Sequence, residues 1–534
     1  MKKAKKGIAL LLVALMLVSF AGCGNGAIEG SLTEPEGEVA FPAELSIFCA
    51  KSASLFGDMV DYNEVTSFKL LEEATGTHIN WTVPPGTGLQ EKFNLMVAGG
   101  ELTDIIINDW YTLGAQQYIE DGILVDISPY VPKYMPNLWK FSEENPDLAR
   151  AYILDGGKIY TPCMIRKDQR LNVFFGPVIR TDWLEKLNLK TPETADDLYK
   201  VLQAFKTQDP NGNGKADEIP MSQAGGGQVG VISYLLHMFN TTNGFYLKDG
   251  KVTYGVLEPE FKTGLEYVTK LYKEGLLDVD FLLQDRTTML GKITNNQVGF
   301  SFEYQPTQVM TTMKDDPTFK FEGIPNFKDS RGKEFTLQSA YTNGVLTGRA
   351  AGITTACADP FGAMKWLDFL YGEEGHVIAN FGKEGEQFNY NEEGTPIFVD
   401  EIQNYSGDLT RSQVWGQNFL TYNTYFPSIQ DWDSYGAYLS EHGRAAVETW
   451  ADGVVTDMNL PTLTFDDVQK ETLKTKYTPI ETYVNEQISK MVLGQVPVSD
   501  LDKLVDQINS MGMADVLAIY QASYDAYTTK DIGF

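Results

Sequence analysis

The stretch "VIRTDWLEKLNLKTPETADDLYKVLQAFKTQDPNGNGKADEIP", residues 178–220, determines the fold class. It begins at the end of an apolar strand-like run and continues through two amphipathic segments, "TDWLEKL" and "TADDLYKVLQAFKT". It ends at the start of a second strand, "EIPMSQ". Apolar residues recur at helical spacing in the middle and run together at both ends, so the order is strand, helix, helix, strand. That order predicts an α/β protein.

The same alternation continues through the body of the chain. "ELSIFCA", "HINWTVP", "TDIIIND" and "QVGFSFEY" are expected to be strands. "NEVTSFKLLEEATG" is expected to be a helix that ends at Gly76. The last third is predicted to be mostly helical. At 534 residues with 43% hydrophobic residues, the chain can bury two or three cores.

Ten residues of the opening stretch, "DPNGNGKADE" at 209–218, resemble a calcium-binding loop. Spaced oxygen ligands around a glycine turn are what a hard cation needs. The twelfth position of an EF-hand is Pro220 here, so a neighbouring carboxylate would have to replace the missing bidentate ligand. The alternative is an Asn-Gly turn without metal. The predicted ligands are Asp209, Asn211, Asn213, the carbonyl of Lys215, Asp217 and Glu218.

The position of this loop predicts its role. It joins a helix to the next strand, whereas ligands of open α/β sheets gather at the carboxyl ends of strands. We therefore expect a structural Ca²⁺ far from the ligand cleft.

The N-terminus has the pattern of an exported protein. "MKKAKK" is basic, "GIALLLVALMLVSF" is apolar but short for a membrane span, and Ala21 and Gly22 precede Cys23. The pattern predicts a lipoprotein signal peptide at 1–22, lipidation of Cys23 and a flexible tether at 23–40. The alternative is an ordinary signal peptide cleaved nearby.

The charge excludes one class of partner. The formal net charge is −29, which argues against nucleic acid as a ligand. Four cysteines, one of them Cys23, do not make a disulfide framework or a metal site.

Several fragments, in the chain's own order, resemble extracellular solute-binding lipoproteins of carbohydrate ABC importers, the class that includes maltose-binding protein. Among them are "LEEATGTHINW", "EKFNLMVAGGELTDIII", "DGGKIYTP", the opening stretch and "GMADVLAIYQASYDAY". The resemblance implies a two-lobed fold of the periplasmic-binding-protein kind (type II). Each lobe is then a mixed sheet flanked by helices, with the ligand cleft between the lobes. The calcium loop is similar to that of alginate-binding proteins.

The resemblance also implies domain boundaries and partners. The N-terminal lobe is expected at 41–172 with 320–374, and the C-terminal lobe at 173–319 with 375–534. The implied ligand is an oligosaccharide and the implied partner is the transmembrane part of an ABC permease. The protein is expected as a monomer on the outer face of a Gram-positive-type membrane. Which sugar it binds is not predicted.

Ligand contacts are expected where polar and aromatic residues follow strands or interrupt helices, because sugars stack on rings and bond to polar groups. Segments after the runs "IIIN" and "VGFSF" fit this, as do two Gly- and Pro-interrupted stretches of the last third and the end of one strand. The candidates are Asp109, Trp110, Tyr111, Glu303, Tyr304, Trp415, Tyr425 and Arg180.

The sequence is compatible with three functions other than that of a transport receptor. "GGGQVG" at 225–230 fits a dinucleotide-binding motif, but no second strand of that unit follows. A glycoside hydrolase cannot be inferred from carboxylates alone in a chain with 72 acidic residues, so the protein is predicted not to be an enzyme. The third alternative is a lipoprotein that senses a sugar or peptide for a signalling partner.

Overall fold

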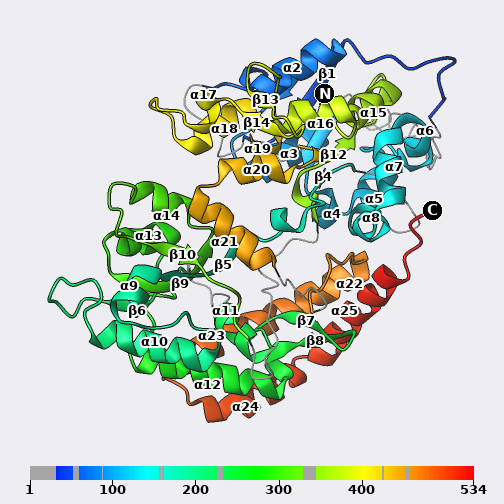
Figure 1. Ribbon diagram of the computed structural model, residues 1–534. Coiled ribbons are helices and arrows are strands. Elements are labelled where there is room, and N and C mark those ends of the chain that lie inside the picture. The colour runs from blue at the N-terminus through cyan, green and yellow to red at the C-terminus, as the bar shows by residue number, and fades with distance from the viewer. Residues whose placement is uncertain are drawn as a thin grey trace, which may run out of the picture.

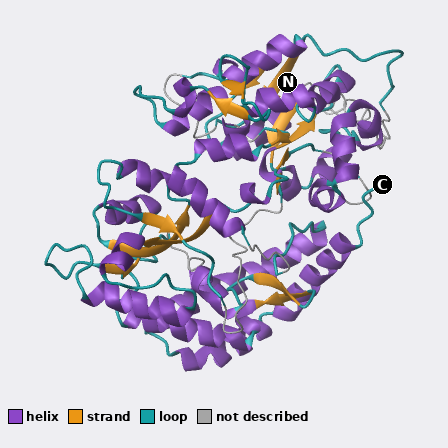
Figure 2. Ribbon diagram, in the orientation of Figure 1, coloured by secondary structure: helices purple, strands orange, loops and turns teal. Residues whose placement is uncertain are grey.

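The computed structural model describes residues 32–51, 59–86, 88–154, 158, 161–225, 232–328, 344–423, 426–452 and 458–533. These residues form two lobes, the upper and lower lobes of Figure 1, and each lobe has its own sheet and apolar core. Helices surround the sheets in both lobes (Figure 2). The expected two-lobed α/β architecture is confirmed.

The upper lobe is built on a four-stranded mixed sheet in the order β12-β3-β1-β2. β1 is parallel to β2 and β3, and β12 is antiparallel to β3. Its strands are β1 (Glu44–Phe48), β2 (His78–Thr82), β3 (Ile105–Asn108), β12 (Ala350–Ile353) and the outer pair β13 (Phe388–Tyr390) and β14 (Pro396–Phe398). Its helices are α2 (Thr66–Thr75), α3 (Leu89–Gly99), α4 (Trp110–Leu113), α5 (Ala115–Glu120), α6 (Val131–Tyr134), α7 (Pro136–Glu144), α8 (Pro146–Tyr152), α15 (Pro360–Phe369), α16 (Glu373–Asn380), α17 (Asp400–Gln403), α18 (Arg411–Asn418) and α19 (Leu420–Asn423).

The lower lobe is built on a second mixed sheet in the order β10-β5-β9-β6. β9 is antiparallel to β5 and parallel to β6. Its strands are β5 (Phe175–Arg180), β6 (Ile219–Met221), β9 (Val298–Tyr304), β10 (Phe321–Gly323) and the hairpin β7 (Phe245–Lys248) and β8 (Lys251–Tyr254). Its helices are α9 (Thr181–Lys186), α10 (Ala195–Thr207), α11 (Ser233–Leu236), α12 (Pro259–Lys273), α13 (Arg286–Thr294), α14 (Thr307–Thr312), α21 (Glu441–Ala451), α22 (Asp467–Thr472), α23 (Thr478–Val492), α24 (Leu501–Ser510) and α25 (Met513–Thr528), and α20 (Trp432–Tyr438) lies where the lobes meet.

Local sequence accounts for several of these boundaries. Thr194 caps α10 by accepting a hydrogen bond from the N–H of Asp197, as its position before the helix predicts. Gly76 ends α2 in the left-handed conformation, with a φ of 70°. β5 is buried along its whole length, and a Cβ at Gly176 would lie 2.5 Å from the indole of Trp450. Glycine there lets α21 pack directly on the sheet.

A three-stranded sheet gathers the connections between the lobes. It consists of β11 (Val345–Leu346), β4 (Met164–Ile165) and β15 (Ser428–Ile429), in the order β11-β4-β15. Each strand lies at the upper-lobe end of a crossing to the lower lobe. Just beyond the strands, Arg166 donates from Nε to Oε1 of Gln430 at 2.7 Å. The segments that connect the lobes are therefore hydrogen-bonded to one another, and we refer to the three-stranded sheet as the hinge sheet.

The lobe boundaries differ from those predicted in two segments. β10 pairs with β5 and so belongs to the lower lobe, although 320–374 was expected in the upper one. The chain from α16 to β15 packs on the upper lobe, although 375–534 was expected in the lower one. Phe426, for example, lies edge-on to Phe68 of α2. Each of the two segments belongs to the other lobe because it pairs or packs with residues that are far away in the sequence.

The C-terminus forms a further link between the lobes. After α25 of the lower lobe, Lys530 donates from Nζ to the carbonyl of Ile153 at 2.6 Å. In return, Arg150 of α8 donates from Nη1 to the carbonyl of Lys530 at 3.0 Å. Ile532 is buried in the core of the upper lobe. We refer to Arg150, Lys530 and Ile532 as the C-terminal clasp.

The described part of the predicted tether is bound to the upper lobe. From residue 32 onward it lies along the upper lobe, where the hydroxyl of Tyr130 donates to the carbonyl of Leu32 at 3.1 Å. Lys365 donates to the carbonyl of Val39 at 2.7 Å, and Phe41 packs edge-on against Phe369. The expectation of a flexible tether over 23–40 is therefore wrong for 32–40. Cys23 lies outside the described residues, within which no helix is long and apolar enough to cross a bilayer.

Substituting Phe41→Ala should release this segment. The change removes the edge contact with Phe369 and the ring beneath the Lys365 ammonium, 5.0 Å from its centroid. We expect faster hydrogen exchange and faster proteolysis across 32–40, with a loss of about 1–2 kcal/mol confined to that segment. Unchanged exchange there, compared with wild type, would mean that Phe41 does not hold the segment. Exchange at β3 serves as the internal control and should not change.

Candidate functional site

An exposed aromatic residue ends the central strand of the lower sheet. Tyr304, the last residue of β9, is 44% exposed. Its ring stacks on Phe174 with centroids 5.7 Å apart and meets Phe175 edge-on at 5.3 Å. These contacts hold the ring in place while leaving part of it open to solvent. A rigid ring of this kind can stack on an apolar face of a ligand.

A buried ion pair supports this ring. Glu303 is 2% exposed and accepts a hydrogen bond from Nε of Arg286 at 2.6 Å. Burial raises the pKa of Glu303 above its ordinary value, and Arg286 opposes that rise. Arg286 also donates to Oε1 of Gln308 at 2.9 Å, and its guanidinium lies 5.1 Å from the centre of the Tyr304 ring. We refer to Tyr304, Phe174, Arg286 and Glu303 as the lower platform.

A buried polar network lies at the carboxyl end of the neighbouring strand β6. Gln223 donates to the carbonyl of Phe302 at 2.8 Å and accepts from the N–H of the same residue at 3.1 Å. Gln284 donates to the hydroxyl of Ser222 and to the carbonyl of Gln223, both at 2.8 Å. The network fixes the segment after β6 next to the lower platform.

A cavity of about 720 Å³ lies between the lobes. Its upper wall comes from α4 and α5, and its lower wall from the start of α22 and the middle of α25. The lobes approach closely here, since a Cβ at Gly114 would lie 3.0 Å from Nζ of Lys470. The lining residues are Trp110, Gly114, Ala115, Gln116, Gln117, Glu120, Leu154, Leu463, Thr464, Phe465, Asp466, Asp467, Gln469, Lys470, Ala522, Ser523 and Ala526.

One lining group of this cavity lacks a partner. Ser523 is 6% exposed, and its hydroxyl makes no hydrogen bond among the described residues. A buried hydroxyl without a partner is costly, so a ligand that bonds to it would gain stability. The cavity therefore combines the ring of Phe465 with amides, carboxylates and one buried hydroxyl that has no partner among the described residues.

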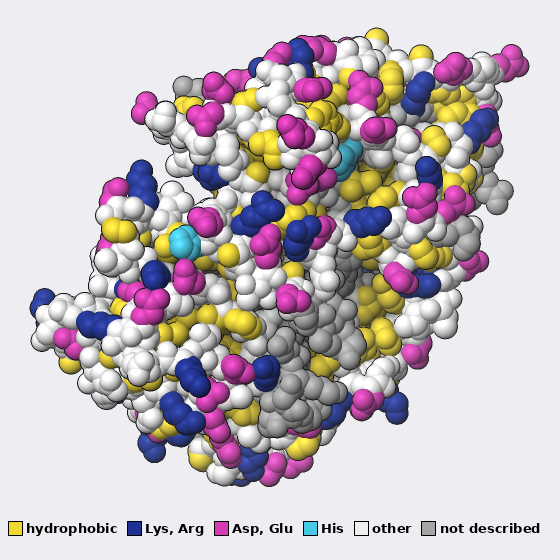
Figure 3. Space-filling view, viewed as in Figure 1, with side chains coloured by type: hydrophobic (Ala, Val, Ile, Leu, Met, Phe, Trp, Pro, Cys, Tyr) yellow, Lys and Arg dark blue, Asp and Glu magenta, His cyan; other side chains and the backbone are white. Residues whose placement is uncertain are grey.

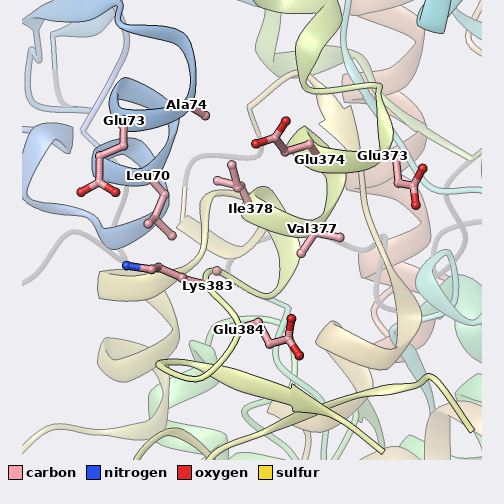
Figure 4. A pocket seen from close by; sticks show the side chains of 10 residues that line it. Leu70, Glu73, Ala74, Glu373, Glu374, Val377, Ile378, Lys383 and Glu384 are labelled. Atoms are coloured by element: carbon pink, nitrogen blue, oxygen red, sulfur yellow. The ribbon is translucent and has the colours of Figure 1, made fainter.

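Another hollow lies on the outer surface of the upper lobe, between α2 and α16 (Figure 4). Leu70, Val377 and Ile378 form its apolar part, and Glu73, Glu373, Glu374 and Glu384 surround it. It borders one lobe only, so it is not the cavity that the two lobes share.

The loop at 209–218 has the turns of a cation-binding loop. The N–H groups of Asn213 and Gly214 donate to the two carboxylate oxygens of Asp209, each at 3.1 Å. The N–H of Lys215 donates to Oδ1 of Asn213 at 2.7 Å. Gly214 has a φ of 74°, which a glycine adopts without strain.

The carboxylate of Glu218 in this loop is perturbed by its surroundings. Glu218 has one buried oxygen, Oε1, without a hydrogen bond. Burial raises its pKa, and the nearby Asp209 and Asp217 raise it further. Such crowding of carboxylates around an unpartnered oxygen suits a bound cation. No three His, Cys, Asp or Glu side chains in the described part of the chain could hold a metal ion by themselves. A cation here would therefore need the amide and main-chain oxygens as well.

Sequence comparison identifies the family. The family described as "Bacterial extracellular solute-binding protein" matches residues 61–377, which is more than half of the chain. The chain belongs to this family.

Two relatives and two solved proteins show how far the similarity extends. The fructooligosaccharide ABC transporter substrate-binding protein FusA of Streptococcus pneumoniae is 27% identical, with 97% of each chain covered. Lipoprotein LipO of Bacillus subtilis is 26% identical over 72% of this chain and 73% of its own. Structures of FusA with kestose and of a FusA EF-hand mutant with fructo-nystose have TM-scores of 0.68 and 0.69. They are 24% identical and cover 91% of this chain and 99% of FusA. The alginate-binding protein AlgQ2 without calcium has the same identity and coverage, with a TM-score of 0.70.

The structure of this solute-binding protein places the predicted contacts in different environments. Asp109 follows β3, Tyr304 is exposed on the lower platform, and Glu303 supports it. Trp110 borders the cavity but is 0% exposed, with its N–H bonded to the carbonyl of Ile106. Its ring packs between Phe93 and Tyr118 and so supports the cavity wall.

Two further candidates lie away from the cleft. Arg180 is at the opposite end of the sheet, because Phe175 at the other end of β5 pairs with Tyr304. It is buried in an ion pair with Asp182 at 2.5 Å. Trp415 is buried among Phe398 and Phe419. Expecting Arg180 and Trp415 as ligand contacts was wrong, since both are structural. The side chain of Tyr111 and all of Tyr425 lie outside the described residues.

Other residues of the site carry no strong sequence signal. Arg286 begins an ordinary helix, and Phe465 to Lys470 lie in a polar stretch near the C-terminus. The register of β9 places Glu303 next to Arg286, and the packing of α22 against the upper lobe places Phe465 to Lys470 at the cavity.

The face of this family member seen in Figure 3 has basic side chains scattered singly and in small groups among acidic ones. The "GGGQVG" segment is described only at Gly225, and the chain after it forms the antiparallel hairpin β7–β8. A βαβ dinucleotide unit would need a parallel strand at that place, so this alternative is excluded.

Replacing Arg286→Met should destabilise the lower lobe in a pH-dependent way. Glu303 would lose its counter-ion in a buried position, and its pKa would rise further. We expect the free energy of unfolding at pH 7.5 to fall by about 2 kcal/mol, less than for a fully buried pair because Arg286 is partly exposed. A carboxyl with a raised folded pKa is stabilised when protonated, so the loss should shrink as the pH falls through that pKa. Denaturant unfolding at several pH values measures this, and the pair R286M/E303Q should recover stability at pH 7.5. An equal loss at every pH would contradict this explanation.

Proposed function

We propose that this protein is a lipid-anchored receptor that captures an oligosaccharide between its lobes and delivers it to an ABC permease. The observation that carries the proposal is the lower platform. It offers a fixed, partly exposed aromatic ring at the carboxyl end of β9. Relatives named for oligosaccharide binding, FusA among them, support the same ligand class.

The site suits a sugar chemically. The C–H face of a pyranose or furanose ring can stack on Tyr304. Gln116, Gln117 and Gln469, which line the cavity between the lobes, offer amides that can bond to sugar hydroxyl groups. A ligand bound in this way contacts both lobes. The hinge sheet joins the two lobes and allows them to close on the ligand. No bond in the ligand has to break.

The carboxylate of the lower platform is not placed for glycoside hydrolysis. The buried carboxylate of the lower platform, Glu303, is paired with Arg286 at 2.6 Å and is 2% exposed. A catalytic acid or nucleophile has to reach the scissile bond, and Glu303 is covered by its own partners. A sensing lipoprotein would bind sugar in the same way, and only interaction with a permease separates it from an importer.

The proposed anchor is a lipid on Cys23, with the protein on the extracellular side. The family is extracellular, and one relative is named as a lipoprotein. Labelling with a radioactive fatty acid in a Gram-positive host would test the anchor. Incorporation should be lost in Cys23→Ser and retained in Cys49→Ser, because Cys49 is buried in the upper core.

The first test of binding is a panel of oligosaccharides measured by calorimetry and by chromatography of the sugar afterwards. We expect saturable binding of at least one intact sugar. Tyr304→Ala should weaken it about tenfold or more, because a stacked ring contributes on the order of 1–2 kcal/mol. Tyr390→Ala is the matched control, since Tyr390 is equally exposed on β13 of the upper lobe. Cleavage products would contradict the receptor function.

We also propose that the loop at 209–218 binds Ca²⁺ for structural stability. The proposed ligands are the oxygens of Asp209, Asn211, Asn213, Asp217 and Glu218 with the carbonyl of Lys215. The unpartnered Oε1 of Glu218 supports this, as does the description of one relative as an EF-hand mutant. Calcium would neutralise the crowded carboxylates and fasten the start of β6.

The loop lies far from the platform. Ile219 pairs with Val298, at the opposite end of β9 from Tyr304, about 20 Å along the strand. Calcium should therefore raise the melting temperature by a few degrees without changing sugar affinity. Glu218→Gln should abolish that rise, whereas Asp249→Asn, in the exposed β7–β8 turn, should keep it. Equal melting temperatures of the wild type with calcium and with chelator would exclude the metal site.

A further inference from the structure

We infer that the cavity between α5 and α22 selects uncharged oligosaccharides over uronate oligosaccharides. The inference rests on the proposed function, and it names the substrate class of the same site. The fold alone does not decide this, because it is shared with an alginate-binding protein and with a protein solved with kestose. Alginate carries a carboxylate on every residue and kestose carries none. The choice between neutral and uronate oligosaccharides therefore depends on the charges that line the cavity of this protein.

The cavity is lined by more negative than positive charge. Glu120 contributes a carboxylate from the upper wall, and Asp466 and Asp467 contribute two from the lower wall. Lys470 is the single cation among the described lining residues. A uronate residue would bring a further negative charge into this space. Like charges at close range repel each other, and salt screens this repulsion because the three carboxylates are exposed.

The cations near the cleft are already neutralised. Nζ of Lys470 lies 3.8 Å from Oδ1 of Asp467, one turn earlier in α22. Arg286 on the lower platform is paired with Glu303 at 2.6 Å and also donates to Gln308. Recognition of a carboxylate usually employs an arginine fork or a lysine that can reach it. Lys470 and Arg286 each already face a carboxylate, so neither brings an unbalanced positive charge to the cleft.

The remaining polar groups match hydroxyls. Carboxylates accept hydrogen bonds only, and sugar hydroxyls can donate to them. The amides of Gln116, Gln117 and Gln469 both donate and accept. Ser523 lines the same cavity, and its buried hydroxyl has no partner in the described structure. A uronate carboxylate could accept from an amide, but it would still face Glu120, Asp466 and Asp467.

The test compares size-matched ligands on the full-length mature protein. Calorimetry is run with neutral tetrasaccharides of glucose, fructose and galactose, and with tetragalacturonate, at low and at high salt. We expect at least one neutral sugar to bind, and tetragalacturonate to bind at least about tenfold more weakly. Raising the salt should reduce this difference, because salt screens repulsion between charges.

Charge-removing variants connect the selectivity to the cavity. The double variant Glu120→Gln with Asp467→Asn should lower the ratio of the uronate dissociation constant to the neutral one by about threefold or more. Glu143→Gln is the matched control, because it removes one carboxylate from the exposed side of α7 and should leave the ratio unchanged.

The outcomes separate the two proposals. If tetragalacturonate binds as tightly as the neutral sugars or more tightly, the selectivity inference is overturned and the oligosaccharide receptor stands. A ratio that is the same in the double variant and in wild type would also overturn the role of the cavity charges. If no sugar of either kind binds, the proposed function itself fails.

Discussion

The pairing of β5 with β9 is the constraint on which the lower lobe depends. Phe175 lies opposite Tyr304, and Ile179 lies opposite Phe300. This register brings Phe174 and Phe175 against the Tyr304 ring at one end of the sheet and Arg180 to the other. A shift by one residue would turn every side chain of β5 to the opposite face. Together with the pairing of Ile219 with Val298, the β5–β9 pairing separates the open aromatic surface from the loop at 209–218.

The contacts between the lobes are of two kinds. The hinge sheet and the C-terminal clasp rely on main-chain carbonyls and buried groups, as in the bond from Lys530 to Ile153. The walls of the cavity instead carry solvated carboxylates and amides. The clasp lies beside this cavity, because Leu154 of the lining directly follows Ile153. Opening of the cavity would therefore have to release the clasp, whereas the hinge sheet could stay paired.

The sequence predicts the elements well and their side-chain environments less well. The order of strands and helices, the cap at Thr194 and the end of α2 at Gly76 follow from local chemistry. The burial of a side chain does not follow from local chemistry. Tryptophan is a residue that often contacts sugars, yet Trp110 and Trp415 are buried in apolar cores. Their environment depends on partners such as Phe93 and Phe398, which are distant in sequence or belong to other elements. Arg286 and Ser523 could not be selected for a similar reason, because α13 and α25 reach the cleft only through tertiary packing.

Because residues 32–41 lie on the upper lobe, they limit the length of chain between Cys23 and the folded protein. With a lipid on Cys23, as proposed, only residues 24–31 connect the membrane to the upper lobe. Eight residues span at most about 30 Å. The receptor would then stay in a thin layer at the bilayer surface. A permease in the same membrane would meet it at a much higher effective concentration than it would meet a receptor free in solution. Releasing Phe41 would more than double the chain available and thicken that layer.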